Sequence, residues 1–235
     1  MNDTLKIILF ASAGGLPIVF GGLLSSFLKA KKFKFKKGLN HWVIAFGGGA
    51  LLAAIAFALV PRGSLELSLA ETTITFFLGT SCFMIVDMLI AKSGSPLSQV
   101  LAMMMDSVPE GLALGASFAH NHGLGLLLAI FIGLQNLPEG FNSYLELNER
   151  LTKFKTLFLL FILAFADIFA ALFGEFFLSE KPKIIAYIMI FASGGILYLI
   201  FQDIAPLSKV RKNWVPATGA SFGFIIGMMG EKLIK

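Results

Sequence analysis

Eight apolar segments follow one another along this chain, and each is close to the ~20 residues that a helix needs to cross a bilayer. The connections between them are short, and none is long enough to form a soluble domain. We therefore predict an all-α polytopic membrane protein, with one transmembrane domain over residues 1–235. The predicted helices are 5–28, 42–61, 69–91, 96–118, 123–145, 154–178, 183–203 and 213–230.

The composition agrees with this class, because 57% of the residues are hydrophobic and only 14% are charged. A soluble domain carries about 25% charged residues. The single cysteine, Cys82, excludes an internal disulfide and a thiolate metal cluster. We attribute the net charge of +5 to cationic loops, and we predict contact with membrane lipids and none with nucleic acid.

The positions of lysine and arginine predict the orientation in the membrane. Six lysines lie between residues 29 and 37, and further cations lie at 150–155 and 209–212. With eight spans all three groups fall on one side, so the positive-inside rule places both termini outside. The expected location is the plasma (inner) membrane. Contact of the lysine-rich loop with anionic lipids is an alternative role for that loop.

An internal repeat relates the second and seventh predicted helices. Stretches 46–61 and 191–206 share five residues at equal offsets, although chance similarity in a Gly- and Leu-rich background is an alternative. The two helices would run in opposite directions, and inverted repeats are typical of secondary transporters. We predict an inverted repeat of helices 1–3 and 6–8 around helices 4–5. The shared residues are Phe46/Phe191, Gly49/Gly194, Leu52/Leu197, Ile55/Ile200 and Pro61/Pro206.

A short polar motif occurs twice, as DSVPEG at 106–111 and as QNLPEG at 135–140. Each copy interrupts an apolar segment, where polar residues are costly and therefore suggest function. Several further acids lie within the predicted spans, but no lysine or arginine lies away from the span ends. Acids without basic partners must be protonated, hydrated or bound to a cation, which indicates a cation path.

The spacing inside each motif places oxygen atoms on one helix face. Asp106 and Glu110 are four residues apart, as are Gln135 and Glu139. Each proline lacks an N–H, so the helix is expected to kink and release a backbone carbonyl. Carboxylate, amide and carbonyl oxygens at one depth predict a divalent-cation site. A kinked packing helix with a protonated glutamate is the alternative reading of a single motif copy.

Other polar residues could extend this site. Asp167 lies near the centre of the sixth predicted helix, where it either joins the site or is a protonated core acid. Asp87 and Asp203 lie toward the cytoplasmic ends of their helices, where they either line an exit path or reach the interface. His120 and His122 flank Asn121 in the outer turn between the motif helices, where they either capture a metal or are exposed turn residues.

The two motif helices resemble those of the ZIP (Zrt/Irt-like) divalent-metal transporters, particularly the bacterial branch. That family typically has His-Asn-x-Pro-Glu-Gly in its fourth helix and a comparable polar–x–Pro-Glu motif in its fifth. It has eight transmembrane helices with both ends outside. Asp167 and the stretch QDIAP at 202–206 match the family more loosely.

The resemblance implies a primary metal site formed by Asp106, Glu110, Gln135 and Glu139. It also implies a second site from Ser107, Asn136, Asp167 and a shared Glu139. Asp106 stands where the family usually has histidine, and Ser107 where it has asparagine. The resemblance further implies a homodimer and an elevator-like movement of helices 1, 4, 5 and 6 against helices 2, 3, 7 and 8.

The predicted function is import of Zn²⁺, Fe²⁺ or Mn²⁺, with Cd²⁺ as a further candidate. The metal is cargo, and neither a cofactor nor an enzymatic activity is expected. A core without histidine or cysteine suggests a preference for Mn²⁺ or Fe²⁺ over Zn²⁺. The alternatives are a metal exporter with the same site, and an intramembrane enzyme such as a diaspartyl protease. The sequence has no Gly-x-Gly-Asp motif to support the protease.

Overall fold

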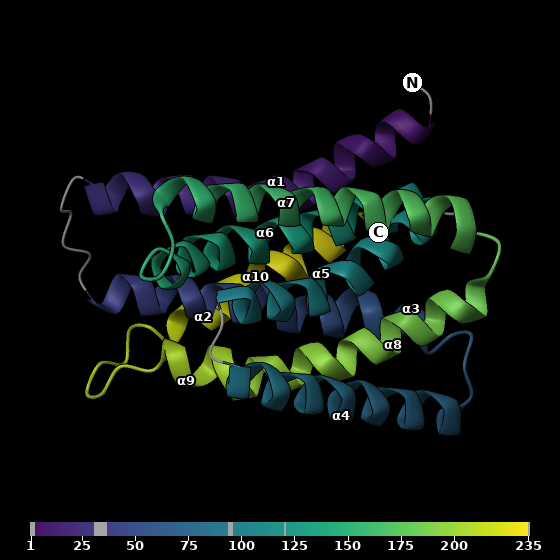
Figure 1. The fold of residues 1–235 in the computed structure, drawn as a ribbon. Helices are drawn as coiled ribbons and strands as arrows, with labels where there is room; N and C mark the ends of the chain where they lie inside the picture. The colour runs from purple at the N-terminus through teal and green to yellow at the C-terminus, as the bar shows by residue number, and fades with distance from the viewer. Residues whose placement is uncertain (1–2, 31–36, 94–95, 120, 235) are drawn as a thin grey trace.

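The computed structural model describes residues 3–30, 37–93, 96–119 and 121–234 (Figure 1). Within these ranges a few side chains are not described, among them that of Asp106. His120 lies outside the described residues.

The described chain is helical, apart from turns and one isolated bridge between Val210 and Asn213. Every predicted apolar segment overlaps a helical stretch. The elements are α1 (Asp3–Ala30), α2 (Lys37–Ala54), η1 (Ile55–Leu59), α3 (Val60–Gly63), α4 (Leu69–Ser93), α5 (Pro96–Phe118), α6 (His122–Leu147), α7 (Lys153–Phe173), η2 (Gly174–Leu178), α8 (Pro182–Leu199), η3 (Ile200–Ile204), α9 (Ala205–Ser208) and α10 (Thr218–Ile234), where η denotes a π-helical turn.

One difference from the predicted boundaries is at α10, which begins at Thr218 and not at residue 213. The side chain of Asn213 accepts a hydrogen bond from the backbone N–H of Val215, at 3.1 Å. This turn and the following Pro216 keep the backbone out of the helix until Thr218. The apolar residues Trp214 and Val215 therefore belong to a loop.

The helices form two groups. The motif bundle consists of α1, α5, α6 and α7, and the flanking helices are α2–α3, α4, α8–α9 and α10. In Figure 1, α1 and α7 lie along one side of the molecule, and α4 and α8 lie along the opposite side. Loops 148–152 and 209–217 lie at one end of the helices, and loops 64–68 and 179–181 lie at the other.

Glycines bring the helices of each group into backbone contact. A Cβ atom at Gly140 of α6 would meet the carbonyl of Ile18 in α1, and one at Gly115 of α5 would meet that of Ala171 in α7. Small residues allow this approach, and close packing is the main attraction between helices in lipid. The motif helix α6 thus packs closely against α1, and the motif helix α5 packs closely against α7.

The glycine contacts recur at closely similar sequence offsets, 145 residues between α2 and α8 and 144 between α4 and α10. Three glycines meet carbonyls of the opposite helix in the pair α2 and α10, and two do so in the pair α8 and α4. Phe46 and Phe191, which the sequence repeat aligns, supply one carbonyl in each pair. This recurrence supports the inverted repeat. The equivalent contacts are Gly49–Ala220 with Gly194–Phe76, and Gly223–Phe46 with Gly79–Phe191.

Two π-helical turns lie at positions that the predicted repeat aligns. η1 begins at Ile55 and η3 at Ile200, which are aligned residues, and each turn is soon followed by an aligned proline. The N–H of Val60 donates to the carbonyl of Ile55, five residues back. The wider turn helps to accommodate the proline ring, so the helical stretch continues past Pro61 and Pro206.

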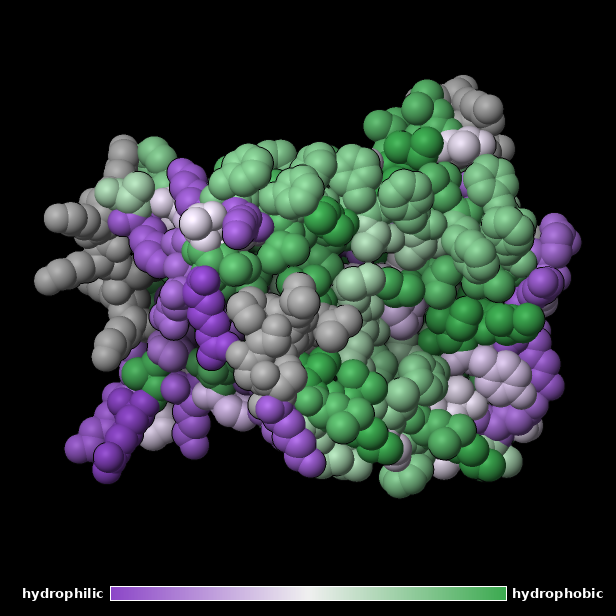
Figure 2. All heavy atoms as spheres, viewed as in Figure 1, coloured by the Kyte–Doolittle hydropathy of each residue, from purple (hydrophilic) through white to green (hydrophobic). Residues whose placement is uncertain are grey.

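The surface has the pattern expected of a membrane protein. Figure 2 shows hydrophobic residues over the middle of the molecule and hydrophilic residues toward its two ends. Among the described residues, six helical stretches are long and apolar enough to cross a membrane. α5, which carries the first motif, and α10, with 17 residues, are not among those six.

Candidate metal site

The two motifs meet through a hydrogen bond between their helices. Nε2 of Gln135 in α6 donates to Oε2 of Glu110 in α5. Both side chains are buried, with exposed fractions of 3% and 2%. Pro109 and Pro138 lie within α5 and α6, and both helices continue past them. The motif residues therefore keep their helical spacing, as predicted.

The carbonyl oxygen of Gln135 is the clearest sign that this position accommodates a ligand. Oε1 is buried, and no hydrogen-bond donor reaches it from the part of the chain that the structure describes. A buried polar atom without a partner costs about 1–3 kcal/mol. A cation or a water molecule would satisfy this oxygen. Because the nitrogen of the same amide is held by Glu110, the oxygen is fixed in orientation.

The other predicted ligands of the primary site lie on the same two helices. Glu139 is half-buried and follows Gln135 by one helical turn, which places both on one face of α6. The backbone of Asp106 belongs to α5, but its side chain lies outside the described part. Among the described side chains, no three from histidine, cysteine, aspartate and glutamate gather into a metal-binding group. The predicted site thus depends on Asp106 and on the Gln135 amide.

A second polar contact joins three helices beside this pair. Nδ2 of Asn136 donates to the carbonyl of Gly14 in α1 at 3.0 Å, and to Oδ2 of Asp167 in α7 at 3.2 Å. Asn136 and Asp167 are buried, with exposed fractions of 1% and 4%. The structure thus brings together two of the residues predicted for the second site. Ser107 is buried in α5.

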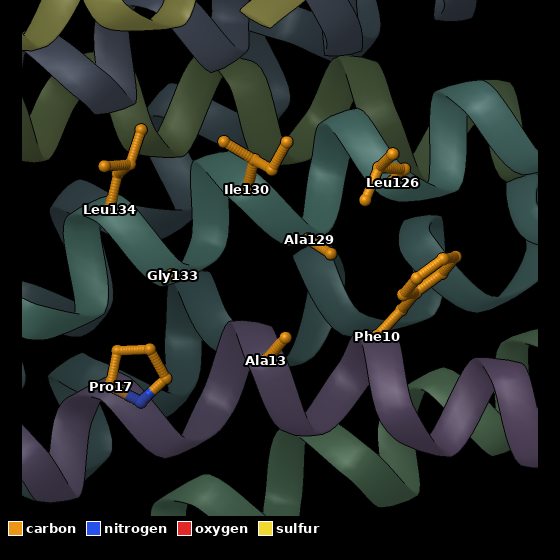
Figure 3. A pocket seen from close by; sticks show the side chains of 8 residues that line it. All are labelled: Phe10, Ala13, Pro17, Leu126, Ala129, Ile130, Gly133 and Leu134. Carbon is orange, nitrogen blue, oxygen red and sulfur yellow. The ribbon is translucent and has the colours of Figure 1, made fainter. Parts of the chain in front are cut away.

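The groove in Figure 3 lies on another face of α6. It has a volume of about 260 Å³ and lies between α1 and α6. Helical spacing directs Gln135 and Glu139 away from it. An apolar lining provides no metal ligands, so this groove is not the candidate site. It is lined by Phe10, Ala13 and Pro17 of α1 and by Leu126, Ala129, Ile130, Gly133 and Leu134 of α6.

Comparison with known sequences gives one informative result. The chain is 35% identical over 141 residues to the zinc transporter GufA of Myxococcus xanthus, a ZIP family member. The match covers 59% of this chain and 56% of the relative. The resemblance to the ZIP family is confirmed. The chain spans about half the length of this curated relative, and models of known protein families give no match.

The ZIP resemblance and the apolar helices together identify a multi-pass membrane protein. The relative is a transporter, which agrees with the prediction that this chain is not an enzyme. The similarity extends over more residues than α5 and α6 contain together, so it does not rest on the two motifs alone.

The residues predicted to line an entry or exit path for the metal lie in different surroundings. The hydroxyl of Tyr198 donates to Oδ2 of Asp87 at 2.8 Å. Asp203 is half-buried in η3, where the charges of Asp87 and Glu146 act on it. His122 is exposed at the start of α6, and its ring stands edge-on to Phe118 with centroids 4.5 Å apart. The predicted pair with His120 falls outside the described residues.

Two polar features were not identified from the ZIP-like motifs. One is the Gly14 carbonyl, because a backbone acceptor leaves no mark in the sequence. The other joins α4 to α8, where Oε1 of Glu71 lies 2.7 Å from both Nζ of Lys183 and the hydroxyl of Tyr187. Ser68 and Glu71 form a capping box at the start of α4, and their spacing could have indicated it.

Proposed function

We propose that this protein imports divalent transition-metal ions across the plasma membrane, through a site on α5 and α6 near mid-membrane. The proposal includes eight spans with both termini outside, so that α5 and α10 also cross the bilayer. The sequence resemblance to a zinc transporter supports metal as the cargo. The repeated motif and its buried contact support the location of the site.

One observation carries the proposal. The Glu110 carboxylate and the Gln135 amide are buried together between apolar helices, and the amide oxygen has no donor within the described residues. A carboxylate buried in hydrocarbon is costly unless a cation or hydrogen bonds compensate it. With Glu139 and Asp106 on the same helices, the site would offer oxygen ligands to a divalent ion.

The ligand chemistry suggests which ions are carried. Carboxylate and amide oxygens suit Mn²⁺ and Fe²⁺ well, whereas Zn²⁺ and Cd²⁺ gain more from imidazole or thiolate. We propose all four as substrates, with Mn²⁺ and Fe²⁺ favoured relative to a site that contains histidine. A negative-inside potential of 100 mV would favour inward movement of a divalent ion by ~4.6 kcal/mol.

The packing of the two helix groups supports a movement of one against the other. Within each group, glycines bring backbones together. Between the groups, Gly47 of α2 faces the ring of Pro138, with 3.0 Å from its built Cβ to Cγ, and Gly227 of α10 faces the ring of Phe131 at 2.6 Å. Side-chain contacts can slide more readily than interlocked backbones. An elevator-like movement of the motif bundle, within a homodimer, is therefore part of the proposal.

The test is uptake of radiolabelled Mn²⁺, Fe²⁺ and Zn²⁺ into proteoliposomes. We expect saturable uptake by the wild type and a loss of at least about tenfold in Glu110→Ala and Glu139→Ala, equivalent to ~1.4 kcal/mol or more. Glu180→Ala removes an exposed carboxylate from the turn before α8 and should leave uptake unchanged. Absence of uptake by folded wild-type protein would refute transport of these ions.

The same assay tests the ion preference. Asp106→His adds an imidazole to the proposed site and should raise Zn²⁺ uptake relative to Mn²⁺. An unchanged ratio of the two ions in this variant would contradict the assignment of Asp106 as a ligand.

A further inference from the structure

Three buried hydroxyl groups lie in the motif bundle, toward the end where loop 148–152 is found. Ser25 and Ser26 of α1 and Thr156 of α7, here called the hydroxyl set, have exposed fractions of 1%, 4% and 0%. None of the three hydroxyl oxygens has a hydrogen-bond partner within the described residues. Burial of a polar atom is costly unless a partner satisfies it, so the hydroxyl set indicates a ligand that bonds to these oxygens.

The hydroxyl set differs from other hydroxyls in the helices of this protein. A serine or threonine in a helix can donate to the carbonyl four residues before it. Thr73, Thr80 and Ser193 do so, at distances of 2.8, 3.1 and 2.7 Å. The hydroxyl set makes no such bond. Its donors and acceptors are therefore available to a ligand between the helices.

The packing of α1 against α7 places two members of the set opposite each other. A Cβ atom built at Gly22 of α1 would meet Cδ1 of Leu160 in α7. Ser26 follows Gly22 by one helical turn, and Thr156 precedes Leu160 by one turn. Because α1 and α7 run in opposite directions, both side chains lie at the same level on the facing sides of the two helices.

The third member of the set faces α6. A Cβ atom built at Gly21 would meet backbone atoms of Leu137 and Phe141 in α6. Ser25 follows Gly21 by one turn and so lies on the same side of α1. The hydroxyl set is therefore placed where α1 packs against both α6 and α7.

The hydroxyl set is separate from the candidate metal site. Ser25 follows Gly14 by 11 residues, and Thr156 precedes Asp167 by 11 residues, which is ~16 Å along each helix. An apolar cluster fills the bundle between these two levels. Its buried members are Ile18, Met103, Tyr144, Leu160, Leu163 and Ala164.

The chemistry of the hydroxyl set favours a neutral ligand. Its three side chains carry no charge, and each can both donate and accept a hydrogen bond. The exposed lysines Lys29, Lys153 and Lys155 lie at this end of the same helices, and their charge disfavours a cation. Water both donates and accepts, and a buried water typically makes about three hydrogen bonds to polar groups.

We propose that the hydroxyl set binds ordered water, which joins α1 to α7 by hydrogen bonds inside the motif bundle. The water would bridge the helices at a level where hydroxyls replace the glycines that bring the backbones together further along α1. The inference goes beyond the proposed function and does not depend on it, because the apolar cluster separates the hydroxyl set from the metal site.

The first test is the melting temperature of detergent-purified protein. Thr156→Val keeps the shape of the side chain but removes the hydroxyl. With water bound, the loss of one hydrogen bond should lower the melting temperature by about 2–4 °C. Thr73→Val makes the same change at an exposed position of α4 and should have little effect. An increase in the melting temperature of Thr156→Val would overturn the proposal, because a dry, unbonded hydroxyl is costly to bury.

The second test detects the water directly, by X-ray radiolytic labelling in ¹⁸O water and mass spectrometry. Leu160 is fully buried beside the hydroxyl set and should acquire ¹⁸O, whereas Leu128, buried in the other apolar cluster, should not. Labelling of Leu160 should fall several-fold in Thr156→Val, or in Ser26→Ala if that variant does not fold. Equal labelling of the two leucines in the wild type would overturn the proposal.

A third measurement distinguishes water from a monovalent cation. Replacement of Na⁺ and K⁺ by choline should leave the melting temperature of the wild type unchanged. A melting temperature that falls on this replacement in the wild type, but not in Thr156→Val, would overturn the assignment of water and indicate a bound cation.

Discussion

The motif bundle and the flanking helices are packed in the same way but differ in what they bury. Glycine-to-backbone contacts join α1 to α6 and α5 to α7, and equivalent contacts join α2 to α10 and α4 to α8. Among the described residues, every buried polar side chain except Ser193 lies in the motif bundle. Close packing is thus common to both groups, whereas polar burial distinguishes the bundle.

Two side-chain links between flanking helices lie near the helix ends, whereas the hydroxyl of Thr80 in α4 donates to the Gly194 carbonyl of α8 nearer the middle, at 3.1 Å. Tyr187 bonds to Glu71 where α8 and α4 begin, and Nε1 of Trp42 donates to the hydroxyl of Thr218 at 3.1 Å where α2 and α10 begin. Tyrosine and tryptophan are favoured at membrane interfaces, where the ring is apolar and its donor reaches polar groups. In the proposed function, the bundle would carry the metal site and the flanking helices would form its support.

Disruption of the shared packing should have the largest effect. In Gly140→Ala the new methyl group would collide with the backbone of Ile18, and neither helix can relieve this by turning a side chain. We expect a loss of at least about 1–3 kcal/mol of stability, seen as aggregation or a lower melting temperature in detergent. Gly230→Ala is the control, because its Cβ would meet Leu127 at 3.6 Å, an ordinary contact. Equal stability of both variants would show that α1 and α6 are not tightly packed at Gly140.

Removal of a glutamine amide should lower metal uptake if the glutamine lies in the motif bundle, and should leave uptake unchanged if it lies in the flanking helices. Gln135→Leu removes the hydrogen bond to Glu110 and the buried oxygen, and we expect metal uptake to fall about tenfold, or ~1.4 kcal/mol. Gln202→Leu changes an exposed glutamine of η3 and should retain uptake. Similar losses in the two variants would remove the functional distinction between the helix groups.

The smallest effect is expected at the end of the flanking helices. Tyr187→Phe removes the hydrogen bond to Glu71 but leaves the ion pair with Lys183. We expect a loss of about 1 kcal/mol in stability or less, since the contact is at the surface, and no change in uptake. Thermal unfolding and uptake by the same preparation measure both. A marked loss of uptake at normal stability would give these helices a more direct part in transport.

The sequence predicts the helices and the motif faces well, because both depend on local pattern. Apolar runs locate the helices, and four-residue spacing places Gln135 and Glu139 on one face. The pairing of Asn136 with Gly14 could not be predicted, because it depends on how α1 packs against α6. The late start of α10 was missed because Trp214 and Val215 continue the apolar pattern while the Asn213 turn interrupts the helix. The role of Asp106 remains a prediction.

The contact between α2 and α10 has a consequence for biosynthesis. α2 is made early, but its glycine-lined face is matched by Gly219 and Gly223 of α10, which follows every other described helix in the chain. In the proposed topology, α2 would lie in the bilayer with lipid against this face until α10 has been synthesised. Lipid chains can occupy a smooth apolar face at little cost, so the last helix displaces lipid and not another part of the protein.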